Sequence, residues 1–181
     1  MSRPSFILVT GNPGKMAEAR RLAGLDFESV TVDLPEIQSL SYEEIVREKA
    51  AEAWRLLGRP LVVEEAGLGL LALGGFPGPL VKWMLEAAGA EGIARTGLAL
   101  GDARATATCL LLYKDHDREI LAEGETHGTL IAPGRGSKGF GFDPVFVPDR
   151  SGLTYGELEG PEKDATSHRG KAWRELIRRL G

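Results

Sequence analysis

Near the N-terminus, a short apolar run passes directly into a glycine-rich turn. Phe6 to Thr10 is nearly continuous in apolar side chains, which is typical of a strand buried on both faces. Gly11-Asn12-Pro13-Gly14 ends this run, and a helix is expected to start near Lys15. A strand that leads through a turn into a helix is the beginning of an α/β pattern, and this order limits the folds open to the chain.

The alternation of strands and helices continues through the first half of the chain. Capping residues mark the helix ends: Ser41 and Glu44 have the spacing of a capping box, and Gly58 suits a left-handed C-terminal cap. The predicted elements are a strand at Val30 to Asp33, a helix from Ser41 to Gly58, a strand at Leu61 to Glu64 and, after a Gly-rich stretch to Gly78, a helix from Pro79 that ends before Gly89.

The second half is rich in strands and ends in one helix. The predicted elements are a hairpin of Ala105 to Tyr113 with Glu119 to Gly128, a strand at Phe140 to Val147, and a closing helix with an apolar stripe at Trp173, Leu176, Ile177 and Leu180. Neither an internal repeat nor a linker divides the chain, so we expect one domain over residues 1–181.

Composition excludes several classes of protein. With 22 Lys and Arg against 26 Asp and Glu, the net charge is −4, which argues against a broad basic face for a nucleic acid polymer. Apolar runs are shorter than the ~18 residues that span a membrane. The lone Cys109 cannot build a disulfide framework, so a reducing cytoplasm is the expected location. A small anionic ligand remains open.

The turn from Thr10 to Lys15 is a candidate phosphate site. We expect free backbone amides at the following helix N-terminus, and such amides, with a lysine beside them, attract phosphate. Two residues separate the glycines and Met16 follows the lysine, so the segment is not a Walker A loop. The alternative is an ordinary turn with a solvated lysine. The later Gly134-x-Gly136-x-x-Gly139 precedes a predicted strand and is therefore not a dinucleotide-binding motif.

Three further groups of residues could take part in binding. Phe140 and Phe142 flank Gly141 and could stack on a base or belong to the core. The pair Glu64-Glu65 at a strand end could hold Mg²⁺ together with substrate phosphates, or be solvated. In the third group, Ser167 could cap the last helix. His168 and Arg169 would then lie in its first turn, where an anion, a carbonyl-rich ligand or nearby acids would offset their charge. The three histidines lack metal-ligand spacing.

Four motifs, in order along nearly the whole chain, resemble those of the inosine triphosphate pyrophosphatase family. They are Thr10-Gly-Asn-Pro-Gly-Lys15, Ala72-Leu-Gly-Gly-Phe-Pro-Gly-Pro79 with Lys82-Trp83, Gly139-Phe-Gly-Phe-Asp-Pro144, and Glu162-Lys-Asp-Ala-Thr-Ser-His-Arg169. The resemblance implies an α/β fold with a long mixed sheet flanked by helices, two lobes around a central substrate cleft, and a homodimer. It also implies Mg²⁺-dependent hydrolysis of ITP, dITP and XTP to the monophosphate and pyrophosphate.

The resemblance also implies roles for individual residues. Glu36 and Glu65 match metal-binding carboxylates, and Glu65 matches the proton acceptor. The residues that match substrate contacts are Thr10, Gly11, Asn12, Pro13, Gly14 and Lys15 with Lys49 and Lys82 at the triphosphate, Ala66 after the catalytic acid, and Phe140, Gly141, Phe142, Asp143, Lys163, His168 and Arg169 at the nucleoside. All of them must converge on one pocket.

The chain departs from the family pattern at two places. Glu65-Ala66 stands where Asp followed by Ser or Thr is typical, so a ligand contact at Ala66 can involve only backbone. Phe142 stands where Trp or Tyr is frequent, and its ring cannot hydrogen-bond.

From this resemblance, the predicted function is a pyrophosphatase for ITP, dITP and XTP. The alternatives are a triphosphate pyrophosphatase with another base preference, and a nucleotide-binding sensor with little turnover.

Overall fold

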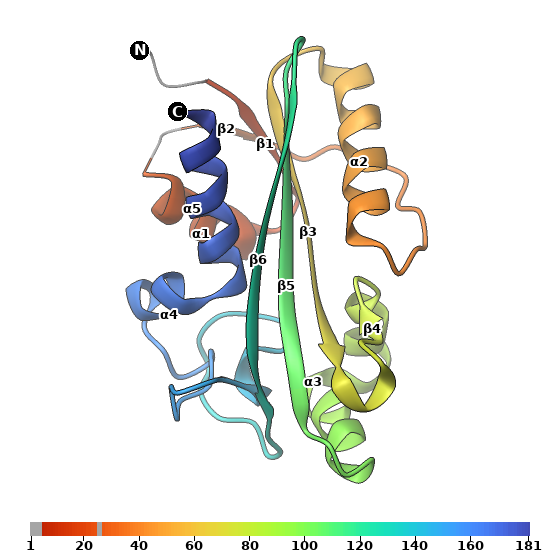
Figure 1. Ribbon diagram of the computed structural model, residues 1–181, viewed down its shortest axis with the longest axis vertical. Coiled ribbons are helices and arrows are strands. Elements are labelled where there is room, and N and C mark those ends of the chain that lie inside the picture. Colours follow the sequence, from red (N-terminus) through yellow and green to blue (C-terminus); the bar gives the residue numbers. More distant parts are fainter. Residues whose placement is uncertain (1–4, 25–26) are drawn as a thin grey trace.

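The computed structural model describes residues 5–24 and 27–181, and these residues form an α/β fold with a seven-stranded mixed sheet (Figure 1). The strands are β1 (Ile7–Val9), β2 (Glu28–Val30), β3 (Leu61–Leu70), β4 (Pro77–Gly78), β5 (Arg104–Lys114), β6 (Glu119–Leu130) and β7 (Phe146–Pro148). The helices are α1 (Pro13–Ala23), α2 (Tyr42–Leu57), α3 (Val81–Ala99), α4 (Gly160–Thr166) and α5 (His168–Leu180), with short 3-10 turns at Leu71–Leu73 and Asp143–Val145.

The order of strands in the sheet is β2-β1-β3-β5-β6-β7, and β4 pairs with β3. β1 is parallel to both of its neighbours, whereas β3, β5, β6 and β7 pair antiparallel. Parallel neighbours need a crossover connection, and α1 and α2 provide it. The predicted α/β fold with a mixed sheet between helices is confirmed.

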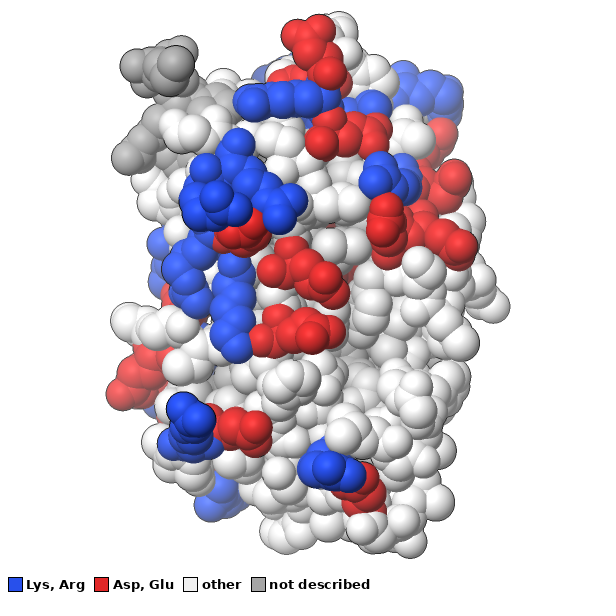
Figure 2. All heavy atoms as spheres, viewed as in Figure 1, with Lys and Arg blue, Asp and Glu red and all other residues white. Residues whose placement is uncertain are grey.

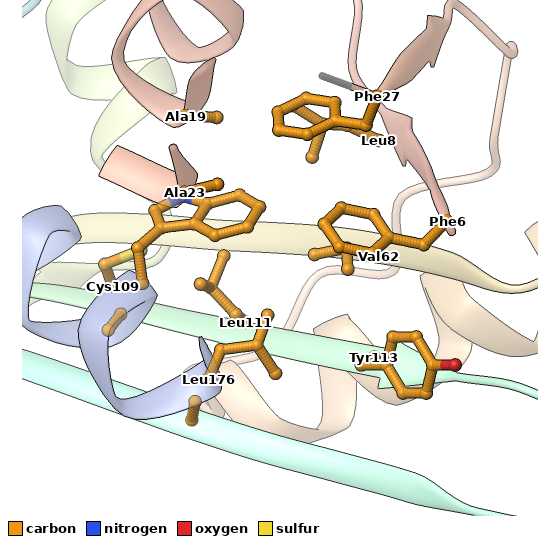
Figure 3. Packing of buried hydrophobic residues seen from close by; sticks show 13 residues of the cluster. Phe6, Leu8, Ala19, Ala23, Phe27, Val62, Cys109, Leu111, Tyr113 and Leu176 are labelled. Atoms are coloured by element: carbon orange, nitrogen blue, oxygen red, sulfur yellow. The ribbon is translucent and has the colours of Figure 1, made fainter. Parts of the chain in front are cut away.

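The helices cover the sheet on both faces. On one face, α1 and α5 pack over β1, β3 and β5 around the rings of Phe6, Phe27 and Trp173, and Figure 3 shows the first two rings side by side. On the other face, α2 packs through Val46 and Ala50. Because side chains alternate along a strand, successive residues of β3 point to different helices. None of the helices formed by the described residues has the length and apolar character needed to span a bilayer.

Local signals predicted both ends of α2 correctly and the start of α1 to within two residues. Asn12 caps α1, which begins at Pro13 and so two residues earlier than expected. Ser41 caps α2, and Gly58 ends it in the left-handed conformation. The reciprocal half of the capping box is replaced by a relay, because the Ser41 N–H donates to Ser39 Oγ at 3.0 Å and Ser39 Oγ in turn donates to the Glu44 carboxylate. The hairpin of β5 and β6 is present and longer than predicted.

Several predicted boundaries are wrong, because contacts distant in sequence determine them. The second strand covers Glu28–Val30, pairing with β1, and does not extend to Asp33. The Gly-rich stretch after Glu65 continues β3 to Leu70: glycine is needed at Gly67 because a Cβ there would lie 2.1 Å from the Gly78 carbonyl oxygen of β4. Helical residues continue after Gly89, where φ of 70° produces a kink.

The segment from Phe140 to Val147 is mainly a turn and not the predicted strand. Gly139 and Gly141 have positive φ angles of 74° and 63°, and the Asp143 carboxylate accepts the Phe140 backbone N–H at 2.8 Å. Only Phe146–Pro148 pairs in the sheet, as β7. This turn places the Phe140 ring against Gly14 of α1 and the Phe142 ring beside His168 of α5.

Candidate active site

The turn after β1 is held by its own side chains. Asn12 Oδ1 accepts the backbone N–H groups of Gly14 at 2.9 Å and Lys15 at 3.1 Å, and the Asn12 N–H donates to Thr10 Oγ1 at 3.2 Å. The expectation of free amides at this helix N-terminus is therefore wrong for Gly14 and Lys15, because the cap already uses them. The turn presents the Lys15 ammonium, whose side chain is partly exposed.

Residues from distant parts of the chain line two adjoining cavities of about 390 and 570 Å³. Both are lined by Asn12, Lys15, Glu36, Lys49, Lys82 and Trp83. The first is also lined by Glu65, Ala66, Phe140, Gly141, Phe142, Asp143, His168 and Arg169, and the second by Thr10, Gly11 and Glu64. Lys15, Glu65 and Arg169 thus open onto one space.

Three residues of the predicted set line neither cavity. Pro13 begins α1, and Gly14 lies under the Phe140 ring, where a Cβ would come within 2.5 Å of Phe140 Cδ1. Gly14 therefore lets the aromatic turn rest on the N-terminus of α1. Lys163 is buried behind the wall, and its ammonium lies 2.7 Å from Asp143 Oδ2.

Lys49 holds two carboxylates together at the cavity. Its Nζ lies 2.6 Å from Glu65 Oε2 and 3.0 Å from Glu36 Oε1. Burial lowers the pKa of Lys49, but Glu65 and Glu36 outweigh that effect, and the pKa lies above its ordinary value. Burial also disfavours the charged form of Glu36 and so raises its pKa, but Lys49 and Lys82 have the larger effect and lower it. Lys49 and Glu36 are therefore both charged at neutral pH.

The two carboxylates that meet at Lys49 are compatible with a divalent cation that also binds phosphate. Glu36 and Glu65 carry oxygen ligands of the kind that Mg²⁺ prefers, and they meet at a single ammonium ion. In the described part of the chain, no three or more His, Cys, Asp or Glu side chains are arranged to hold a metal ion by themselves. The arrangement fits a Mg²⁺ ion that takes one or two carboxylates and completes its coordination with ligand phosphates and water.

A chain of buried ion pairs lies behind the other side of β3. Arg169 donates to Glu64 through Nε at 3.0 Å and Nη2 at 2.9 Å, and through Nη1 to Glu18. Lys163 Nζ continues the chain at 2.7 Å from Glu18 Oε1. Lys15 Nζ ends it at 3.3 Å from Glu64 Oε1. All of these side chains except Lys15 are buried, and each of their charges lies beside an opposite charge, as buried charges require.

These partners shift the pKa of the buried carboxyl groups. Burial alone raises the pKa of Glu64, but the charges of Arg169 and Lys15 lower it to about 2. Glu18 follows the same pattern: its pKa is lowered by Arg169 and Lys163 against the effect of burial. Both groups are therefore anionic at neutral pH.

The aromatic end of the cavity combines rings with polar groups. Phe142 is buried in the core and also lines the cavity, whereas Phe140 is partly exposed beneath the cations of Lys163 and Arg169, which lie 5.2 and 5.3 Å from its centroid. Phe142 therefore belongs to the core, both rings line the cavity, and their role as a platform for a base stays a prediction. His168 is buried beside Phe142, with ring centroids 6.0 Å apart.

His168 lines the cavity at the start of α5 and has one ring nitrogen without a partner among the described residues. Ser167 caps α5, as predicted, by accepting the Gly170 N–H at 3.0 Å. His168 Nδ1 is buried without a hydrogen-bond partner among the described residues. Burial, and then the charges of Arg169 and Lys163, lower the pKa of His168 well below its ordinary value. The imidazole is therefore neutral and can donate one hydrogen bond and accept another.

Sequence reasoning missed two sets of residues. Glu18 was not singled out, although it follows Lys15 by three residues on α1 and must therefore share its face of the helix. The apolar wall of the first cavity was also missed, apart from Trp83 in the second motif, and it consists of Ile37, Ile45, Leu80, Val81, Trp83 and Leu85. Glu18 had a usable signal in its spacing, whereas this wall comes from three separate segments.

Comparison with known proteins agrees with this arrangement. The model of the Ham1 family matches residues 6–179. An inosine triphosphate pyrophosphatase of Puccinia graminis f. sp. tritici is 36% identical over 97% of this chain and 96% of its own, and inosine triphosphate pyrophosphatase 2 of Trypanosoma cruzi is 43% identical over 94% and 89%. A HAM1 protein structure from Coxiella burnetii is similar, with a TM-score of 0.83, 26% identity, and coverage of 97% and 98%. The chain belongs to the Ham1 family.

Proposed function

We propose that this protein is a nucleoside triphosphate pyrophosphatase that hydrolyses ITP, dITP and XTP to the nucleoside monophosphate and pyrophosphate. Relatives named inosine triphosphate pyrophosphatase match nearly the full chain. The observation that carries the proposal is the cavity itself, since Lys15, Lys49 and Lys82 lie around it together with two aromatic rings and the polar groups of His168 and Arg169. Residues 1–181 are proposed to act as a single domain.

The cations provide the binding site for the triphosphate. Lys15, Lys49 and Lys82 line both cavities and would offset the charge of the phosphates. The same charges stabilise the negative charge that develops on a departing pyrophosphate. Thr10, Gly11 and Asn12 line the second cavity beside them and are proposed to contact the phosphate chain.

Glu36 and Glu65 are the residues that would hold Mg²⁺. When bound, the ion would supply positive charge to the phosphate oxygens and help to orient the triphosphate. Lys49 already lies within hydrogen-bond distance of both carboxylates and would balance their charge without the ion. Ala66 has no hydroxyl to add to this set, so any contact it makes with a ligand is through its backbone.

Glu65 is the proposed proton acceptor. A water oxygen forms a bond to the α-phosphorus, the α–β anhydride bond breaks, and its electron pair leaves with pyrophosphate. Glu65 lines the cavity and can orient the water and accept its proton. Lys49, at 2.6 Å, keeps the Glu65 carboxylate in place for this step.

The base would be recognised by proton donors. Hypoxanthine and xanthine carry a 6-oxo acceptor, whereas adenine carries an amino donor at this position. Arg169 has five N–H groups and uses three on Glu64 and Glu18 within the described residues, which leaves two. His168 can donate as well. Adenine would place a donor against these donors and leave buried groups unpaired, and this loss would discriminate against ATP.

The aromatic turn would bind the face of the base. Phe140 and Phe142 would stack on the base, while Gly141 and Asp143 complete that end of the cavity.

A homodimer in the cytoplasm completes the proposal. The lower part of the face in Figure 2, over α3 and β4, carries few charges. The exposed large apolar side chains in and next to these segments are Leu71, Phe76, Trp83, Leu98 and Leu100, and a second copy could cover part of them. The single buried thiol of Cys109 suits a reducing compartment. Sedimentation analysis of the purified protein tests the dimer.

An activity panel tests the function. ITP, dITP, XTP and the common triphosphates are incubated with the protein, with and without Mg²⁺, and the products are identified. Pyrophosphate plus monophosphate, formed faster from ITP than from ATP and only with Mg²⁺, is the expected result. Orthophosphate as the product would contradict the proposal, and saturable binding without products would favour a nucleotide sensor.

A Glu65→Gln variant tests the proposed proton acceptor in the same assay. Its matched control is Glu48→Gln, which makes the same change at an exposed position next to Lys49 on α2.

A further inference from the structure

Glu64 is a buried carboxylate that the proposed reaction does not use, yet it contacts a cation from each end of the site. Its Oε1 lies 3.3 Å from Lys15 Nζ, at the phosphate end. The same oxygen accepts Arg169 Nη2 at 2.9 Å, and Oε2 accepts Arg169 Nε at 3.0 Å. Glu64 lines the second cavity, whereas Arg169 lines the first.

We infer that Glu64 is a positioning residue that couples the two ends: its carboxylate fixes the Arg169 fork for base recognition and restrains the Lys15 ammonium at the phosphates. This inference depends on the proposed function, because it assigns roles within that site. Glu64 acts through these two cations and is not a catalytic residue.

The two contacts have opposite effects on binding. A bidentate contact restricts a guanidinium in orientation, so the remaining N–H groups of Arg169 have a defined direction. Toward Lys15 the carboxylate acts as a competitor, because it neutralises part of the charge that would otherwise attract a polyanion. Glu64 therefore improves discrimination between bases at the cost of affinity for phosphate.

Glu18 provides a matched comparison. It is also a buried glutamate that accepts a hydrogen bond from Arg169, and its other partner is Lys163 at 2.7 Å. Unlike Glu64, it forms no ion pair with Lys15 within the described part of the chain, and it lines neither of the two cavities. Substituting either glutamate disturbs Arg169, but only substitution of Glu64 also releases Lys15.

The experiment compares Glu64→Gln and Glu18→Gln by two measurements. The first is the ratio of kcat/KM for ITP to that for ATP, which should fall about tenfold or more in both variants, because Arg169 loses a charged partner. The second is the Kd of inorganic tripolyphosphate, measured by calorimetry without divalent cations so that turnover does not occur. It should fall about three- to tenfold in Glu64→Gln, because one opposing charge is removed near Lys15, and change less than twofold in Glu18→Gln.

The pattern separates coupling from a general structural role. A merely structural Glu64 would, on substitution, weaken tripolyphosphate and both nucleotides together, and that result would overturn the inference. An unchanged ITP to ATP ratio in a folded Glu64→Gln protein would also overturn it. If the wild-type protein does not hydrolyse ITP, the proposed function fails, whereas the tripolyphosphate measurement still tests the contact with Lys15.

A second variant covers the case in which Glu64→Gln does not fold. Glu64→Asp keeps the charge but is one methylene shorter, so it cannot reach both cations in the same geometry. We expect it to lose ITP preference by about threefold or more without a gain in tripolyphosphate affinity. Wild-type preference in Glu64→Asp, or failure of both variants to fold, would replace the positioning role with a purely structural one.

Discussion

Glu64 and Glu65 are neighbours in β3, yet their carboxylates bind cations on opposite faces of the strand. Glu64 faces α1 and α5 and contacts Lys15 and Arg169, whereas Glu65 faces α2 and contacts Lys49. The separation follows from the alternation of side chains along a strand. It means that two adjacent acids serve different parts of one site.

Glu65→Gln should lower kcat for ITP by about 10²- to 10⁴-fold, the range for loss of a general base. The free energy of unfolding should change little, because the side chain lines the cavity and Lys49 keeps Glu36 as a partner. Steady-state kinetics and urea unfolding of the same preparation measure the two effects. An unchanged kcat would remove Glu65 from the proposed role.

Arg169→Ala should destabilise the protein by about 3–5 kcal/mol, because it leaves the buried carboxylates of Glu64 and Glu18 without this cation. The change is measured as a shift of the urea midpoint. In the double variant Arg169→Ala with Glu64→Gln, part of this loss should be recovered, since one uncompensated charge is gone. Equal destabilisation in the single and double variants would show that charge is not the cause.

Arg169→Ala should also reduce the preference for ITP over ATP. The preference is measured without urea, at a temperature at which the variant is folded. The reason is the loss of two N–H donors toward the 6-oxo group. Equal losses of kcat/KM for the two substrates would instead assign Arg169 to phosphate binding or to structure alone.

The buried imidazole of His168 should make stability depend on pH between about 5 and 7. Its pKa is lowered by burial in the folded state, whereas the unfolded chain binds a proton below about 6.5. Unfolding therefore takes up a proton, and the free energy of unfolding should fall with decreasing pH by up to about 1.4 kcal/mol per pH unit. Glu64, with a pKa of about 2, contributes its own loss only below about pH 4.5.

Urea unfolding at pH 5, 6 and 7 measures this slope in the wild type and in His168→Gln. The variant should lose the part of the slope that His168 contributes, so the difference in stability between the two proteins should vary with pH. A difference that is constant from pH 5 to 7 would contradict a neutral, buried His168.

Gly124→Ala should destabilise the protein by about 1–3 kcal/mol or more and lower activity. A Cβ at this position of β6 would lie 2.1 Å from the His168 carbonyl oxygen and 2.5 Å from the Ala172 nitrogen, both in the backbone of α5. The substitution must therefore push away the helix that carries His168 and Arg169. Thermal unfolding and ITP hydrolysis measure the two effects.

Gly160→Ala is the matched control for Gly124→Ala. The atoms nearest to a Cβ at Gly160 belong to the Arg21 side chain, and the shortest distance, 3.5 Å, is ordinary contact. Wild-type stability and activity are expected for it. Comparable losses in both variants would show that close packing of α5 on β6 is not what makes Gly124 necessary.

The parts of the fold predicted correctly depend on contacts within a few residues. The caps at Ser41 and Ser167, and the left-handed Gly58, involve hydrogen bonds or backbone angles that belong to the local sequence. The wrong boundaries depend on partners distant in sequence. The extension of β3 through Gly67 requires Gly78 of β4 and Cys109 and Thr108 of β5, which no local pattern contains.

The candidate site divides in the same way. From residue type and motif alone, the chain revealed a lysine after a strand turn, an acid pair, an aromatic turn and a Ser-His-Arg helix start, and the family resemblance joined them. Only the tertiary structure decided that Glu64 turns toward Arg169 and Lys15 while Glu65 turns toward Lys49, and that Glu18 and Lys163 complete the buried ion pairs. The physical reason is that a charge buried away from water must find its partner wherever the folded chain brings one, and sequence distance does not limit that choice.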